Sequence, residues 1–120
     1  MTDARAALES CPALALRQAA RRATRALDAA LKDSGLTLAQ AGLLARVATA
    51  PDDTIGALAA GLDLDPSTLS RTLRGLEKAG LVEIALVETD LRRRAVWLTE
   101  AGARRLAAAL PAWRAAQARV

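Results

Sequence analysis

A change of periodicity between residues 54 and 99 constrains the fold more than any other feature of the sequence. Apolar residues recur at helical three- and four-residue steps in a short segment, 55–60, and in a longer one, 66–79. Two strand-like apolar runs follow at 81–86 and 95–98, and charged residues separate them. A short helix, a turn, a longer helix and an adjoining hairpin form a helix-turn-helix unit with an appended hairpin.

Residues that begin or end helices support these limits. Thr54 is a candidate N-cap for the short helix, and Gly61 is a candidate C-terminal stop for it. At the start of the longer helix, Asp65 offers a side-chain oxygen to the free backbone N–H groups, and Pro66 suits the first turn. Gly80 is expected to end that helix.

Helical segments are also predicted before this unit. Residues 1–11 are interpreted as a loose lead-in. Pro12 suits a first helical turn, and apolar residues at helical spacing predict a helix from there to about Lys32. The pair Ser34-Gly35 ends it.

Two further helices complete the expected order. Thr37 is a candidate N-cap for a helix at 38–49, and Pro51-Asp52-Asp53 is predicted to be a turn. Thr99 is expected to cap a last helix, which Pro111 interrupts or kinks, leaving a short basic tail. The sequence therefore predicts a mainly α fold with one small β-hairpin.

Composition excludes several classes of function. The 120 residues suffice for one domain. The chain has no histidine and one cysteine, Cys11, which excludes the usual zinc sites, a Ser-His-Asp triad, a Cys-His pair and an internal disulfide. The carboxylates are scattered and form no spaced set for acid–base catalysis or for a metal cage. We therefore expect no enzyme, no metal and no cofactor.

Charge and hydropathy indicate the compartment and the type of partner. No apolar run reaches the ~18–20 residues that a membrane span needs, and the N-terminus does not resemble a signal peptide. We therefore expect a cytoplasmic protein with no membrane partner. The net charge of +4 and the isoelectric point of about 10.5 agree with a nucleic-acid partner, although charge alone does not identify one.

The predicted helix at 66–79 has two different faces. At about 100° per residue, its leucines cluster on one side. The opposite side carries hydroxyl, guanidinium and ammonium groups, from Ser67, Arg71, Arg74 and Lys78. These groups suit phosphates and base edges in a DNA major groove. Near the helix start, Ser67, Thr68 and Ser70 are small and would allow a close approach to DNA. The other interpretation is a solvated helix face.

The charged segment between the strands is the second candidate site. Arg92, Arg93 and Arg94 are expected at the hairpin tip, with Asp90 pairing one of them and holding the shape of the loop. A narrow minor groove attracts inserted arginines because it focuses negative potential. The alternative interpretation of this segment is a solvated surface loop whose charges only maintain solubility.

Two motifs then occur in a specific order and spacing. The first is LDLDPSTLSR at 62–71, continued by LEKAGLV at 76–82. The second is Asp90-x-Arg92, followed by VWLTEAG at 96–102. These resemble the recognition-helix and wing signatures of the MarR family of bacterial transcriptional regulators. The region from residue 36 to 47 is similar to the second helix of that family, and the resemblance covers roughly residues 12–110.

The resemblance implies a homodimer that binds a roughly palindromic site on double-stranded DNA, usually as a repressor at a promoter. The recognition helix would enter the major groove and the wing a flanking minor groove. The major-groove residues would be Ser67, Thr68, Ser70, Arg71 and Arg74. The wing residues would be Arg92, Arg93 or Arg94, with Asp90 as their structural partner.

The same resemblance predicts the domain organisation. We expect one domain at 1–120, a winged helix-turn-helix core at 36–99, and dimerisation helices at 12–33 and 99–120. Family members usually continue for about another helix beyond the position of Val120. This leaves three expectations open: a smaller dimer, a dimer that depends on the first helix, or no dimer. A winged-helix module that binds protein rather than DNA is the alternative function.

Regulation of such a protein has two candidate inputs. The family's ligand pocket lies between the DNA-binding lobe and the dimerisation helices, so the resemblance adds a small-molecule effector as a partner. The sequence has no Tyr, Phe or His, so the usual aromatic walls of that pocket are missing. Some relatives sense peroxide with a cysteine near the position of Cys11, which makes it a candidate redox residue. The alternative is a small, half-buried apolar side chain.

Overall fold

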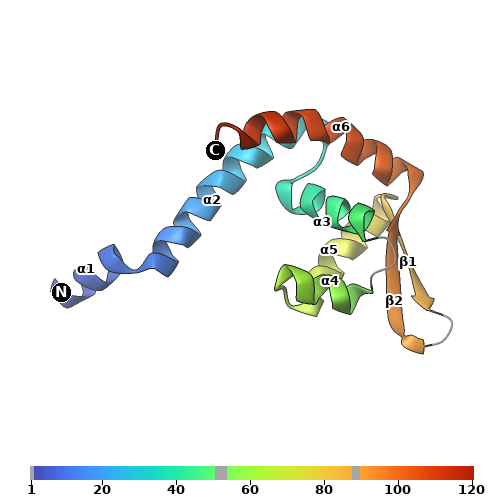
Figure 1. Cartoon of the computed structure of the whole chain (residues 1–120), viewed down its shortest axis with the longest axis horizontal. Coiled ribbons are helices and arrows are strands. Elements are labelled where there is room, and N and C mark those ends of the chain that lie inside the picture. Colours follow the sequence, from blue (N-terminus) through green and yellow to red (C-terminus); the bar gives the residue numbers. More distant parts are fainter. Residues whose placement is uncertain (1, 51–53, 88–89) are drawn as a thin grey trace.

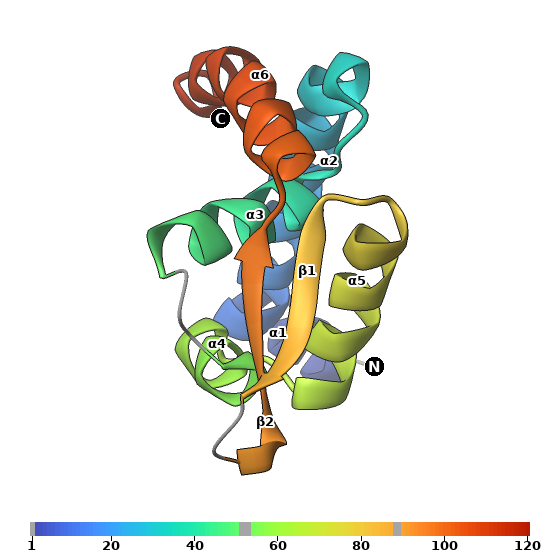
Figure 2. The same cartoon turned by 90° about the vertical axis from the view of Figure 1, so that its right-hand side faces the viewer.

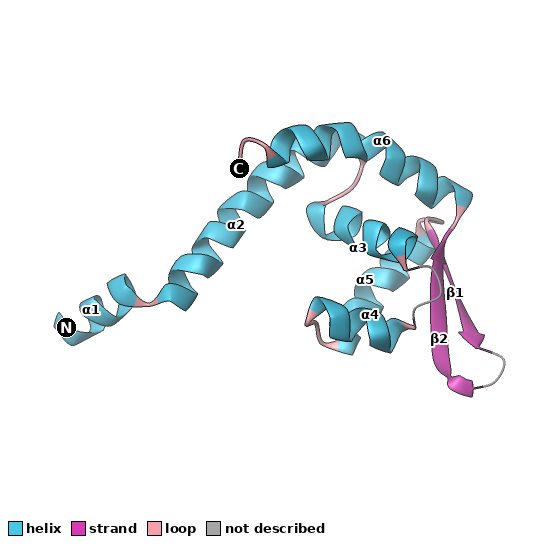
Figure 3. Ribbon diagram, viewed as in Figure 1, coloured by secondary structure: helices cyan, strands magenta, loops and turns pink. Residues whose placement is uncertain are grey.

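The computed structural model describes residues 2–50, 54–87 and 90–120. The elements follow in the order α1 (Thr2–Ser10), α2 (Pro12–Leu31), the 3-10 turn η1 (Lys32–Ser34), α3 (Leu38–Thr49), α4 (Ile55–Leu62), α5 (Pro66–Lys78), β1 (Val82–Val87), β2 (Asp90–Leu98) and α6 (Glu100–Gln117). Figure 1 shows a lobe of α3, α4, α5 and the hairpin, with α6 lying above it and the long α2 leading away. The order of secondary structure is easiest to follow in Figure 3. The turn predicted at 51–53 lies outside the described residues.

The predicted N-caps are confirmed at three helices. The side chains of Thr37, Thr54 and Thr99 each accept a hydrogen bond from the backbone N–H three residues on. At α3 the arrangement is a full capping box, because the side chain of Gln40 also accepts from the backbone of Thr37. Gly35, which has a φ of 74°, follows η1 as expected of a helix stop.

The lead-in predicted at 1–11 is wrong for residues 2–10, which form α1. Alanine and leucine favour a helix there. Asp3 lies in the first turn, where a carboxylate interacts favourably with the positive end of the helix dipole. The helix stops because Pro12 supplies no backbone N–H and disfavours helical angles at the residue before it. Cys11 is accordingly extended, with φ −82° and ψ 109°, and Pro12 begins α2.

The turn between α4 and α5 differs from the prediction in two ways. Gly61 does not stop α4; the helix continues through Leu62 and ends at Asp63, which adopts a left-handed φ of 53°. The half-buried Leu62 packs against the core, which favours the two extra helical residues, and aspartate tolerates a left-handed backbone better than most residues. Asp65 does not cap α5 with its side chain. Its carboxylate instead accepts a hydrogen bond from the Ser67 hydroxyl, a local donor that competes with the backbone N–H groups.

The hairpin starts and ends differently from the prediction as well. The strands β1 and β2 are antiparallel and pair in register from Val82 opposite Leu98 to Leu86 opposite Arg94. The next pair joins Val87 to Asp90, so the register shifts there, and the bulge or irregularity falls at residues 91–93 of β2. The three arginines therefore lie in β2 and not at the hairpin tip. Strand pairing depends on the backbone, and charged side chains are common on exposed sheet edges.

The core lies where the hairpin, α3, α4, α5 and α6 meet. Figure 2 shows α5 and α4 on either side of the hairpin and α6 above it. The largest fully buried side chains of the core come from α2, α3, α5 and the two strands, and they are Leu31, Leu44, Val47, Leu69, Leu73, Leu76, Val82 and Val96. Leu58 of α4 and Ala109 of α6 close the core from two sides.

The last helix does not break at Pro111. The proline lies inside α6, which continues to Gln117. A proline in a helix removes one backbone hydrogen bond and crowds the preceding turn. Burial of Ala109 and Ala116, and packing of Trp113 on the core, stabilise the helix on both sides of this defect. In the described part of the chain, no helix is long and apolar enough to cross a membrane.

We predict that Gly102→Ala strongly destabilises the protein. A Cβ at Gly102 would lie 1.9 Å from the carbonyl oxygen of Leu81, and a backbone carbonyl cannot swing away as a flexible side chain can. Overpacking of this kind costs about 1–3 kcal/mol or more. Gly61→Ala is the matched control, because no atom lies within 4 Å of the place that a Cβ would occupy there in α4. It should raise the free energy of unfolding by about 0.5–1 kcal/mol. Urea unfolding measures both changes, and equal stability of the two variants would contradict the packing described here.

Candidate nucleic-acid interface

Helix α5 presents a polar face to solvent because its apolar face is buried in the core. Leu69, Leu73 and Leu76 are at most 1% exposed. The residues predicted on the opposite face are all exposed: Ser67, Arg71, Arg74 and Lys78. Among the described residues, none of these three basic side chains forms an ion pair. The predicted division of the helix is therefore confirmed, and the cationic groups are available to an anionic partner.

Thr68 and Ser70 do not share this face. At about 100° per residue they lie on opposite flanks of α5. Thr68 is exposed, and its carbonyl accepts a hydrogen bond from the Thr72 hydroxyl at 3.2 Å. Ser70 is half-buried and points toward the hairpin, where it lines a hollow together with Arg74 and Arg94. The structure thus divides the set of small polar residues that the sequence placed together.

The hairpin arginines also separate. Arg94 is exposed and lies in β2 at the rim of the hollow beside α5. The backbones of Asp90, Arg92 and Arg93 belong to β2, but their side chains lie outside the described part of the structure. The predicted pairing of Asp90 with an arginine, and the minor-groove roles of Arg92 and Arg93, therefore stay predictions.

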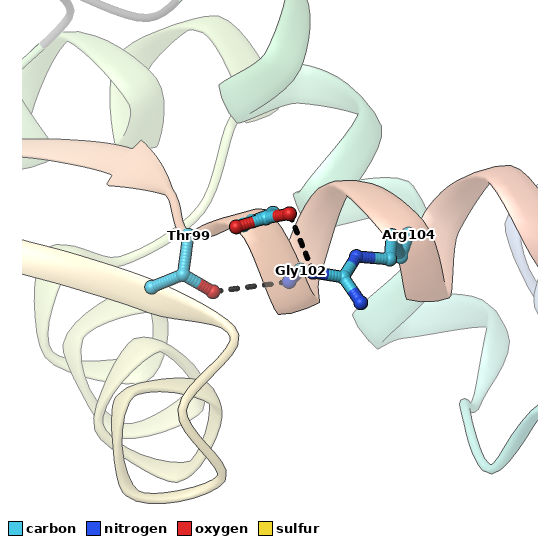
Figure 4. A network of polar contacts seen from close by, with 4 residues as sticks. Thr99, Gly102 and Arg104 are labelled. Carbon is cyan, nitrogen blue, oxygen red and sulfur yellow. Dashed lines mark hydrogen bonds and ion pairs between the residues drawn. The ribbon is translucent and has the colours of Figure 1, made fainter.

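One junction holds the recognition-type helix, the hairpin and α6 in a fixed arrangement. The Thr99 hydroxyl donates to the carbonyl of Gly80 at 2.6 Å and accepts from the N–H of Gly102 at 3.0 Å. The N–H of Thr99 donates to the carbonyl of Leu81 at 3.1 Å. Figure 4 shows Thr99 and Gly102 at the start of α6, together with Arg104, which forms an ion pair with Glu100 of the first turn. The sequence predicted the Thr99 cap but not the bond to Gly80, which joins residues far apart in the chain.

Comparison with known proteins agrees with this architecture. A sequence model of the MarR family matches residues 34–93, from η1 to the bulge of β2. The crystal structure of the M. tuberculosis transcriptional regulator MosR in complex with DNA superposes with a TM-score of 0.85 at 35% identity, covering 92% of this chain and 80% of that one. The chain belongs to the MarR family.

Two further solved structures extend the comparison. A MarR mutant from E. coli, solved with operator DNA, matches with a TM-score of 0.79 and 27% identity over 86% of this chain and 74% of that one. The S. aureus MepR–DNA complex has the same fold, with a TM-score of 0.82 at 21% identity over 90% of this chain and 80% of that one. No match was found among curated proteins. The winged helix-turn-helix predicted from the sequence is thereby confirmed as the fold.

An apolar cavity of about 450 Å³ lies where the family's ligand pocket was expected, between the winged lobe and the last helix. Leucines of α3, of α5 and of the α4–α5 turn line it, together with Arg46 and Trp113. Trp113 thus supplies an aromatic wall that the lack of Tyr and Phe did not suggest. The small-molecule effector stays a prediction.

Of the remaining residues, Cys11 lies away from the lobe and Trp97 lies on the hairpin. Cys11 is half-buried at the start of α2 and is a free thiol, so its redox role also stays a prediction. Trp97 is partly exposed, on the opposite side of β2 from the buried Val96, and its indole N–H donates to Glu83 at 3.1 Å. Within the residues that the structure describes, no cluster of three His, Cys, Asp or Glu side chains is arranged to hold a metal ion.

Proposed function

We propose that this MarR-family chain is a transcriptional regulator that binds specific sites on double-stranded DNA. The observation that carries the proposal is the exposed polar face of α5, which a fully buried leucine face holds outward. Guanidinium and hydroxyl groups on such a face can donate hydrogen bonds to base edges in a major groove. The MosR and E. coli MarR relatives were solved with DNA, which supports the same type of partner here.

The wider proposal follows the family pattern. The helix α5 enters a major groove, the hairpin carries Arg92 and Arg93 to a flanking minor groove, and two copies bind the halves of a palindromic promoter site. In this proposal the protein acts as a repressor when it occupies the promoter. The alternative, a winged-helix module that binds protein, predicts no preference for any duplex and a pull-down partner that no longer binds when the α5 face is mutated.

We predict that Arg71→Ala weakens binding to the specific site more than binding to random DNA. A bidentate contact from arginine to a base contributes about 1–3 kcal/mol of discrimination, or about 5- to 150-fold in affinity. The measurement is a titration of labelled duplexes from the gene's upstream region and of a random duplex at the same salt concentration. Arg104→Ala removes an equal charge from α6 and should leave the specific affinity nearly unchanged. Equal losses on both duplexes for Arg71→Ala would sink its role in reading sequence.

We predict that Arg92→Ala and Arg93→Ala act mainly through the phosphate backbone and the minor groove. Each variant should weaken binding to specific and random DNA by a similar factor. Removing one arginine–phosphate interaction should flatten the slope of log affinity against log salt by about 0.9, because fewer counterions are released on binding. Titrations at four or more salt concentrations measure the slope. An unchanged slope for both variants would contradict the proposed role of the hairpin.

We also propose that two copies associate through the N-terminal helices. The helix α1 has no buried residue, and α2 buries none before Leu27. Leu16 lies on the same face of α2 as Leu27 by helical geometry, yet it is 69% exposed because α6 covers only the other end of α2 (Figure 1). Leu8 is 67% exposed. A second copy would bury this apolar face, since short helices are marginal in water without packing partners.

We predict that Leu16→Asp disrupts this association. An aspartate on the apolar face would lose its hydration on burial in an interface. Gln18→Asp is the control, because Gln18 lies on nearly the opposite side of α2. Light scattering should give twice the chain mass of 12.5 kDa for the parent protein and for Gln18→Asp, and a single chain mass for Leu16→Asp. A parent protein that is monomeric at micromolar concentration would overturn the dimer.

A further inference from the structure

A second, smaller hollow lies between α5 and the hairpin. Its volume is about 160 Å³, enough for several water molecules, each of which occupies about 30 Å³ in the liquid. Ile55 and Ile84, both half-buried, form its apolar part. The polar groups around it are those of Ser70, Arg74, Glu77 and Arg94. It is separate from the apolar cavity beside Trp113, since the two share no lining residue.

Strand alternation explains why Arg94 faces α5. Successive side chains of a strand point to opposite faces, so Arg94 shares a face with Val96. Val96 is fully buried against the lobe, and its partner across the hairpin is Ile84. Arg94 is the next residue on this core-facing side, and the backbone there is still paired in register, opposite Leu86. Its guanidinium therefore reaches the rim beside α5 and not the outer surface of the hairpin.

Helical spacing brings the other polar groups to the same place. Ser70, Arg74 and Glu77 follow one another at steps of four and three residues, so they lie along one flank of α5. That flank adjoins the DNA-facing side chains, because Arg74 belongs to both. The hollow thus opens next to the surface proposed to enter the major groove.

The charges around the hollow match a single phosphodiester. Two guanidinium charges, from Arg74 and Arg94, oppose one carboxylate, Glu77, which leaves one positive charge. In the described part of the structure no ion pair joins Glu77 to either arginine. Arginine presents a planar fork of N–H donors that suits phosphate oxygens, and the Ser70 hydroxyl adds a donor from the side of the helix.

We propose that Ser70, Arg74 and Arg94 together hold one phosphate of the DNA backbone at the edge of the major groove entered by α5. The site rests on the proposed DNA-binding function and adds to it. In this arrangement Arg94 contacts a phosphate beside the major groove and does not enter the minor groove. The hairpin and α5 then contact the same DNA strand from two sides. Glu77 opposes the phosphate and limits how tightly DNA of any sequence is held.

The test combines a protein variant with neutralised phosphates. The parent protein and Arg94→Gln are titrated with the specific duplex and with duplexes in which one phosphate at a time is replaced by an uncharged methylphosphonate. Arg94→Gln should weaken binding to the unmodified duplex by about tenfold, the effect of losing a charge-assisted hydrogen bond. One methylphosphonate position should weaken the parent by at least this factor, because Ser70 and Arg74 contact the same phosphate. On that duplex the two proteins should bind equally.

Two control variants separate the site from simpler effects. Arg104→Gln removes the same charge from α6 and should leave binding to every duplex nearly unchanged. Glu77→Gln removes the opposing carboxylate, so it should tighten binding to specific and random DNA by a few fold. If Glu77 instead positions Arg94 by pairing with it, Glu77→Gln will weaken binding as Arg94→Gln does, and the proposed site is overturned. Glu77→Gln also tests the proposed site if Arg94→Gln does not fold.

The outcomes distinguish this site from the function on which it rests. If the parent protein prefers no duplex, the proposed function fails and the phosphate site fails with it. If the parent binds specifically but Arg94→Gln binds equally well, only the phosphate site is overturned. The same conclusion follows if the weakening caused by Arg94→Gln persists in full at every methylphosphonate position, because Arg94 then contacts no single phosphate.

Discussion

The Thr99 hydroxyl is the contact on which the geometry of the winged lobe depends. It donates to the carbonyl of Gly80, just past the end of α5, and accepts from the N–H of Gly102 in the first turn of α6. Thr99 itself follows the last residue of β2. One side chain thus ties the recognition-type helix, the hairpin and the last helix together. Only glycine at position 102 lets α6 approach the backbone of Leu81 closely enough to make this junction.

A fixed junction explains how residues distant in sequence can serve one surface. Arg74 and Arg94 are twenty positions apart, on a helix and on a strand, and they line the same hollow. Neither element could hold its arginine there alone, because an isolated hairpin is marginally stable in water and a single short helix frays. Burial of Leu76 and Val96 packs α5 and β2 against the same core, and the hydrogen bonds of Thr99 fix how the two elements are oriented.

Local chemistry made much of the fold predictable. Helix caps such as Thr37 and Thr54 act within three residues, and the leucines of α5 repeat at helical spacing, so both were visible in the sequence. The failures involve packing between distant segments. The helix α4 continues beyond Gly61 because Leu62 packs against the core. The helix α6 continues beyond Pro111 because alanines on both sides of the proline are buried. The strand β2 begins at Asp90, before the irregularity in its pairing, and this is why the arginines lie in β2.

The candidate site shows the same division between local and distant information. The exposed face of α5 follows from counting residues along one helix. The position of Arg94 also follows from counting, but only once the strand is known to begin before it; then alternation from the buried Val96 places it beside α5. The polarity of residues 88–94 alone suggested a loop, and the regular alternation that fixes side-chain direction in a strand does not apply in a loop. A contact to base edges reads sequence, whereas a contact to phosphate sets position and affinity. For Arg94, the direction in which β2 points the side chain would therefore decide which of these two kinds of contact it can make.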